Sequence, residues 1–106
     1  GQGVISLECR KKDQEITQLC KQLTAPEQQL VSKLHVKLLE EIGFDCRDPL
    51  GAYVSLGADR LCISGFVASP DLEHFFEHQN EGPLDASEQV VASWIEVIKN
   101  QRKQWV

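Results

Sequence analysis

The spacing of apolar residues changes from helical to alternating at Gly43, and this change restricts the fold class. Before Gly43, six apolar residues recur at the spacing of one helix face: Leu30, Val31, Leu34, Leu38, Leu39 and Ile42. After it, the period is near two as far as Val67, with glycines and a proline between the runs, which indicates strands. A helix followed by a small antiparallel sheet predicts an α+β fold.

The helix that carries these six residues has recognisable ends. Thr24 is suited to cap its start, Pro26 to occupy its first turn, and Glu27 follows three residues after the cap. Gly43 supplies the residue type that commonly ends a helix. We therefore predict a helix from about residue 25 to 42.

The alternating region predicts a β-hairpin. Strands are expected at Tyr53–Leu56 and Leu61–Val67, joined by residues 57–60, and a short third strand is expected at Phe44–Cys46. Beyond the hairpin, Ser69-Pro70-Asp71 predicts the start of a short helix through His78, because proline is favoured at a first helical position.

Residues 79–83 then resemble a loop, and a last helix is expected from Asp85, with Glu88 three residues later. Its core-facing stripe comprises Val90, Val91, Trp94, Ile95 and Ile98. The predicted order is helix, helix, hairpin, helix, helix. We expect Trp94 to be structural and Trp105, at the basic end of the chain, to make an external contact.

The first part of the chain resembles a coiled-coil seam. Positions at alternating steps of four and three are Ile5, Cys9, Lys12, Ile16, Leu19 and Leu23. In a parallel pair Glu8 would face Asp13, which is repulsive, so a different partner, an antiparallel pair or packing on the chain's own domain stays open. We expect two units, a coiled-coil-like helix over residues 1–24 and a compact α+β domain over 25–106.

Charge is distributed unevenly. The net charge is −5, and residues 61–98 hold no Lys or Arg. Six acids there are predicted to dock a basic partner segment: Asp71, Glu73, Glu77, Glu81, Asp85 and Glu88. Lys99, Arg102 and Lys103 follow as a short basic end suited to an acidic contact. Without a continuous basic face, nucleic acid is not an expected partner, and no apolar run is long enough to span a membrane.

Cysteine spacing and the first residues bear on the compartment. Cys9, Cys20, Cys46 and Cys62 contain no C-x-x-C pair, so a metal framework is not expected and the thiols indicate a reducing intracellular site, cytoplasm or nucleus. The start Gly1-Gln2-Gly3 has the form of a cut end and not of a signal peptide. No cofactor is expected.

Reactive groups are few. Cys46 lies beside Asp45 and Asp48, whose carboxylates raise a thiol's pKa and oppose its use as a nucleophile. Ser64 lacks the G-x-S-x-G elbow, and no phosphate loop is present, so the chain is not expected to be an enzyme.

The helix expected through His78 carries the residue types of a two-ligand metal half-site. His74 and His78 would lie four apart on one face with Glu77 beside them, and Phe75 and Phe76 would be packing anchors. This pattern supports the alternative function, a metal- or ligand-dependent regulatory domain.

The run Leu38-Leu39-Glu40-Glu41-Ile42-Gly43-Phe44, between a heptad helix and a small sheet, resembles RWD-type head domains carried on coiled coils, as in kinetochore linker subunits. The resemblance implies a non-catalytic docking role. We therefore expect a protein–protein interaction and oligomerisation module, a scaffold or adaptor of a larger intracellular assembly. The expected partner-binding residues are Ile5, Cys9, Ile16, Leu19, Leu23, Glu77, Glu81 and Trp105.

Overall fold

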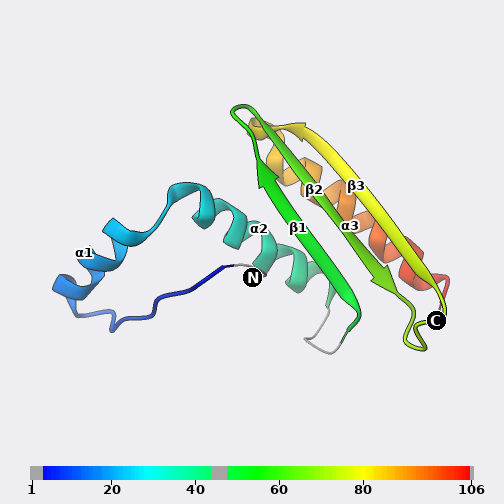
Figure 1. The fold of residues 1–106 in the computed structure, drawn as a ribbon, viewed down its shortest axis with the longest axis horizontal. Coiled ribbons are helices and arrows are strands. Elements are labelled where there is room, and N and C mark those ends of the chain that lie inside the picture. The colour runs from blue at the N-terminus through cyan, green and yellow to red at the C-terminus, as the bar shows by residue number, and fades with distance from the viewer. Residues whose placement is uncertain (1–3, 44–47, 106) are drawn as a thin grey trace.

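A computed structural model describes residues 4–43 and 48–105 (Figure 1). The elements in chain order are α1 (Gln14–Leu23), α2 (Pro26–Ile42), β1 (Leu50–Leu56), β2 (Arg60–Ala68), β3 (Phe75–Pro83), a 3-10 turn η1 (Leu84–Ala86) and α3 (Ser87–Lys103). The α+β prediction is confirmed. None of the described helices is long and apolar enough to cross a membrane.

The three strands form one antiparallel sheet in the order β1-β2-β3. The predicted hairpin is confirmed, because β1 pairs with β2 and Tyr53 lies opposite Ser64. The short strand expected at Phe44–Cys46 lies outside the described residues.

The third strand corrects two predictions, the helix through His78 and the loop at 79–83. Along β3, exposed residues such as Glu77 and Gln79 alternate with less exposed ones such as His78, which is the period of a strand. Before β3 the chain turns tightly: Ser69 Oγ accepts from His74 N–H at 3.0 Å, and Leu72 adopts φ 63°. That left-handed residue prevents a helix from starting at Pro70.

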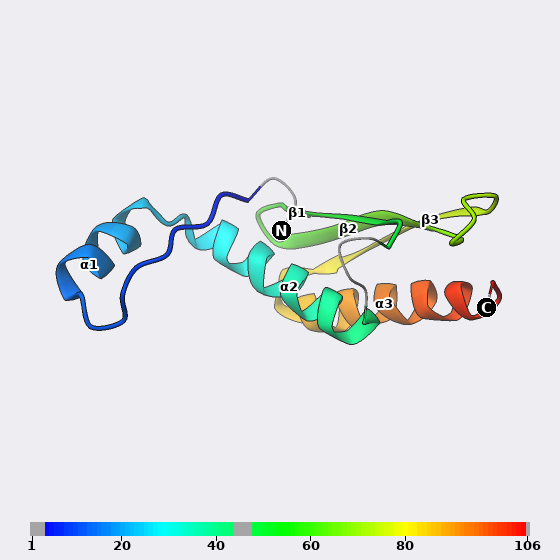
Figure 2. The ribbon, with the colours of Figure 1, turned by 90° about the horizontal axis from the view of Figure 1, so that it is seen from below.

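Both long helices pack on one face of the sheet, so the molecule has two layers (Figure 2). The core between them comprises Val31, Leu34, Leu38, Ile42, Val54, Leu61, Ile63, Val67, Val90, Val91, Trp94, Ile95 and Ile98. Trp94 is fully buried, as predicted, and its Nε1–H donates to the His78 carbonyl at 2.9 Å. A Cβ on Gly65 would lie 2.9 Å from Trp94 Cζ2, so the absence of a side chain there makes room for the indole.

The chain before α2 differs from its prediction. Asp13 accepts from Ile16 N–H at 3.1 Å and so caps α1, which begins at Gln14 and not near Ile5. Residues 4–9 instead lie outside any helix, and Ile5 and Cys9 do not continue the α1 stripe. The division at residue 24 into two units stays a prediction.

The predicted capping box at the start of α2 is also wrong. Thr24 Oγ1 donates to Cys20 O at 2.7 Å and so belongs to the end of α1. Ala25 caps α2 without a side-chain hydrogen bond, while Pro26 at the first turn and left-handed Gly43 at the end are as predicted. α1 buries no residue and stands apart from the sheet (Figure 1). The radius of gyration is accordingly 16.0 Å, against about 13 Å for a compact chain of this size.

Candidate functional site

A groove between the end of α2 and the last turns of α3 gathers positive charge. Its described lining consists of Ile42 from α2 and Lys99, Arg102 and Lys103 from α3. α2 stops beside α3 because Gly43 adopts φ 71° and donates its N–H to Leu39 O at 3.0 Å. We call this site the basic groove.

Arg102 and Lys103 also stabilise α3, because positive side chains in the last turn of a helix interact favourably with its dipole. One cation is already paired: Arg102 Nη2 lies 3.8 Å from Asp48 Oδ1, with the side chains 38% and 29% exposed. Lys99 and Lys103 are exposed and four residues apart on one ridge of α3. The basic groove therefore offers two solvated ammonium groups and a guanidinium, and Ile42 beneath them belongs to the buried core.

The surroundings limit how far this positive charge extends. Lys99 and Lys103 also line an adjoining hollow that contains Glu41 and Glu96. Glu41 is in turn 3.8 Å from Lys37 Nζ, one turn back along α2. The positive field is thus local to the basic groove, which suits a small anion better than an extended polyanion.

Sequence reasoning noted Lys99, Arg102 and Lys103 as a basic end but did not place Ile42 or Asp48 beside them. The contact between α2 and α3 that brings Ile42 to the groove is tertiary, and periodicity within each helix does not report it. The signal available in the sequence was the helix stop at Gly43. Cys46, considered above as a nucleophile, lies outside the described residues.

The residues predicted to bind a partner do not form one site. Ile5 is 93% exposed on the segment before α1. Ile16, Leu19 and Leu23 are exposed on α1, and only Leu23 joins Ile5 in lining a hollow between that segment, α1 and α2. Cys9 is half-buried. Their role in association stays a prediction.

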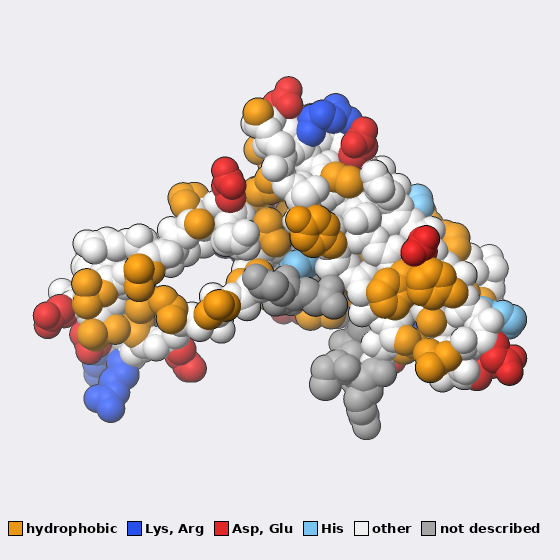
Figure 3. Space-filling view, viewed as in Figure 1, with side chains coloured by type: hydrophobic (Ala, Val, Ile, Leu, Met, Phe, Trp, Pro, Cys, Tyr) orange, Lys and Arg blue, Asp and Glu red, His pale blue; other side chains and the backbone are white. Residues whose placement is uncertain are grey.

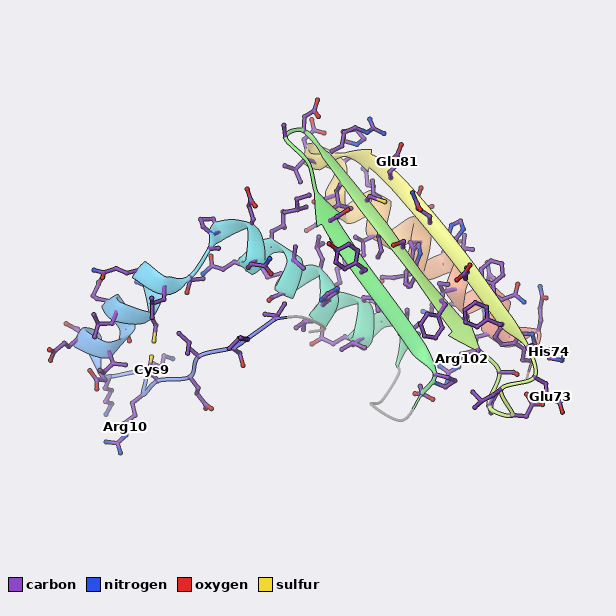
Figure 4. The ribbon with its side chains drawn as sticks, viewed as in Figure 1. Cys9, Arg10, Glu73, His74, Glu81 and Arg102 are labelled. Carbon is purple, nitrogen blue, oxygen red and sulfur yellow. The ribbon has the colours of Figure 1, made fainter. Side chains whose placement is uncertain are left out.

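The acidic residues are also spread out. Glu77 and Glu81 lie on β3, and Glu81 is 3.5 Å from Arg60 Nη2. Glu73 and Glu81 lie near opposite ends of the sheet (Figure 4). The six acids therefore form a long margin and not a compact patch.

His74, His78 and Trp105 occupy different settings from those expected. His74 lies in the turn before β3 and His78 on the strand, so the two do not share a helix face and the predicted half-site geometry is wrong. Within residues 4–43 and 48–105, no three His, Cys, Asp or Glu side chains are grouped to hold a metal. Trp105 is half-buried against the core and stacks on His74 with ring centroids 6.2 Å apart. This position does not test the prediction that Trp105 makes an external contact.

The sheet face opposite the helices carries aromatic residues that sequence reasoning did not assign to a surface (Figure 3). Tyr53 is 64% exposed and Phe75 60% exposed. Phe75 stacks on Phe66 with centroids 5.2 Å apart, and the Phe66 ring covers Gly51, where a Cβ would lie 3.1 Å from Phe66 Cδ1. Phe75, predicted to be a packing anchor, packs on Phe66 at the surface of the sheet and not in the core.

The comparisons with known proteins give a consistent result. The chain is 32% identical to a porphobilinogen deaminase of Nitrobacter winogradskyi over 82 residues, which is 77% of this chain and 26% of that protein. It is 32% identical over 83 residues to one of Brevibacillus brevis, covering 77% and 27%. It is 29% identical over 101 residues to one of Prochlorococcus marinus, covering 95% and 32%. No family model matches.

These relatives overturn the functional expectations drawn from the sequence. The resemblance to RWD-type heads of kinetochore subunits is wrong, because proteins similar over most of the chain are named porphobilinogen deaminase. The expectations of a scaffold or adaptor and of a non-enzyme are wrong for the same reason, and the regulatory alternative gains no support. The chain is similar to porphobilinogen deaminases over most of its own length, while spanning about a quarter to a third of theirs.

Proposed function

We propose that this chain forms the corresponding part of an enzyme that deaminates porphobilinogen. The observation that carries the proposal is the 32% identity over 82 residues to a porphobilinogen deaminase. Since the chain corresponds to 26% of that relative, the remaining machinery of such an enzyme belongs to other parts of it.

The basic groove supports a substrate-binding role within that enzyme. Porphobilinogen is a small aromatic ring bearing carboxylate groups, and Lys99, Lys103 and Arg102 are cations that bind carboxylates. Three of the four described residues that line the groove are cationic, so we expect its role to be anion binding.

The compartment follows from the same proposal. The relatives come from bacteria, which have no nucleus, so they lend no support to the nuclear alternative. We place the enzyme in the cytoplasm.

The test is a chimera in which this chain replaces the matching part of the Nitrobacter winogradskyi protein. We expect the folded chimera to release ammonia from porphobilinogen. A chimera that has native-like circular dichroism and a cooperative melt but releases no ammonia would overturn the proposed function.

A second pair of variants tests the basic groove in the active chimera. Lys99→Gln with Lys103→Gln should raise KM about two- to fivefold per lysine, because an exposed charge contact is worth about 0.5–1 kcal/mol. Lys12→Gln with Lys21→Gln, which removes equal charge from the exposed turn and α1, is the matched control. Equal KM values for both pairs would exclude substrate binding by the groove.

A further inference from the structure

Two cysteines lie together at the junction of α1 and the segment that precedes it. Cys9 Sγ lies 3.5 Å from Thr17 Oγ1, and Cys9 and Cys20 are both half-buried free thiols. Thr17 and Cys20 are three apart on α1 and so share a face of the helix. Figure 4 shows the Cys9 side chain pointing towards α1.

The pKa of the Cys20 thiol is affected by Cys9. Burial raises the pKa of the Cys20 thiol, and the nearby Cys9 raises this pKa further. Cys9 Sγ contacts Thr17, which lies one turn before Cys20, so the Cys9 side chain faces the part of α1 that carries Cys20. The proximity is set by a turn, in which Asp13 N–H donates to Arg10 O at 3.1 Å and folds residues 4–9 back along α1.

We propose that Cys9 and Cys20 form an intrachain disulfide when the chain meets a disulfide oxidant such as oxidised glutathione. Arg10, Lys11 and Lys12 follow Cys9 directly, and their positive charge attracts the negatively charged glutathione disulfide to this end of the molecule. The disulfide covalently ties residues 4–9 to α1, which buries no residue of its own.

The reaction is thiol–disulfide exchange in two steps. The thiolate of one cysteine attacks a sulfur of oxidised glutathione, forming a protein–glutathione disulfide and releasing one glutathione thiolate. The thiolate of the other cysteine then attacks the protein sulfur of that mixed disulfide and releases the second glutathione. The two protein thiols are oxidised, one oxidised glutathione is reduced to two glutathiones, and the two protons pass to the released thiolates.

Cys62 provides an internal control because it lies on β2, opposite Ser55 and Glu81 in the sheet. Its thiol belongs to the sheet layer, while Cys9 and Cys20 belong to the projecting part of the chain. A general tendency of the protein to oxidise would involve Cys62 as readily as Cys9.

The experiment treats the fully reduced chain with oxidised glutathione and analyses it by mass spectrometry without reduction. We expect a product lighter by two hydrogens and a tryptic species that links the peptide ending at Arg10 to the peptide Asp13–Lys21. Amide hydrogen exchange over residues 4–20 should slow in that product. Cys62→Ser should give the same linked peptide.

Cys9→Ser and Cys20→Ser should each abolish the linked peptide and leave a stable glutathione adduct on the remaining thiol of the pair. Because α1 and the preceding segment contribute nothing to the core, both variants are expected to keep the circular dichroism and melting temperature of the parent. Only glutathione adducts in the parent chain, or links that join Cys46 or Cys62 in place of this pair, would overturn the proposal.

Discussion

Replacing Trp94 by phenylalanine tests the idea that one indole joins α3 to the sheet. The side chain is fully buried, its ring occupies the space above Gly65, and its Nε1–H donates to the His78 carbonyl at 2.9 Å. Phenylalanine keeps an aromatic ring but removes the donor and the part of the indole nearest Gly65. The substitution therefore combines a lost hydrogen bond with a cavity.

The expected cost is about 1.5–3.5 kcal/mol in the free energy of unfolding. The lost hydrogen bond accounts for about 0.5–1.5 kcal/mol, and the partly buried carbonyl left without its donor raises this towards the upper end. The cavity adds about 1–2 kcal/mol, since complete truncation of a buried tryptophan costs about 3–5 kcal/mol. For a small domain with a total stability of about 5–15 kcal/mol, such a loss is readily measured.

Urea denaturation followed by circular dichroism measures the cost, with Trp105→Phe as the matched control. Trp105 is half-buried and stacks on His74, so its replacement should cost less than about 1 kcal/mol. If the two variants lose the same stability, Trp94 does not join α3 to the sheet in the manner described.

Three further changes have defined outcomes. Burial lowers the pKa of His35 below its usual 6.5, and both ring nitrogens lack a hydrogen-bond partner among the described residues. Protonation of His35 therefore favours the unfolded chain, and the melting temperature should fall as the pH drops below about 6.5. His35→Phe should reduce this dependence of the melting temperature on pH. Leu72→Gly, which relieves a left-handed leucine at φ 63°, should raise the free energy of unfolding by up to about 1 kcal/mol in urea denaturation, and a loss of 1 kcal/mol would contradict the strain argument. If the acidic margin docks basic segments, an oligolysine probe should bind in a salt-sensitive manner by fluorescence anisotropy, and Glu77→Lys with Glu81→Lys should weaken that binding; equal binding would remove this prediction.

Long elements with strong periodicity were predictable from the sequence, and short or mixed ones were not. The stripe from Leu30 to Ile42 and the stop at Gly43 gave α2 almost to the residue, because a wide apolar face and an end signal agree. The hairpin followed from alternation around residues 57–60. β3 was missed because Phe75 and Phe76 are adjacent and Pro70 lies before them, so local residue types favoured a helix.

The misassigned strand shows which interactions override those local preferences. Phe76, His78 and Asn80 lie on the side of β3 that faces the helices, and Asn80 Nδ2 donates to Val90 O at 3.1 Å. The strand is therefore fixed by pairing with β2 and by contacts to α3, both remote in sequence. The length of α1 was overestimated because the seam-like spacing through Ile5 and Cys9 is not supported by contacts to residues remote in sequence.

The candidate site could be predicted only in part from the sequence, because its basic residues reflect a helix-end preference while its geometry depends on tertiary packing. Arg102 and Lys103 lie in the last turn of α3, where basic residues are favoured because they complement the dipole, so their presence alone does not indicate a binding site. They acquire a binding geometry only when α2 ends beside α3 and brings Ile42 to the groove, with Asp48 3.8 Å from Arg102. That meeting depends on packing in the core, to which α2 contributes Leu38 and α3 contributes Ile98, and no sequence motif records it. The absence of a recognisable catalytic motif therefore does not exclude an enzyme, because binding groups of this kind are brought together by the tertiary structure.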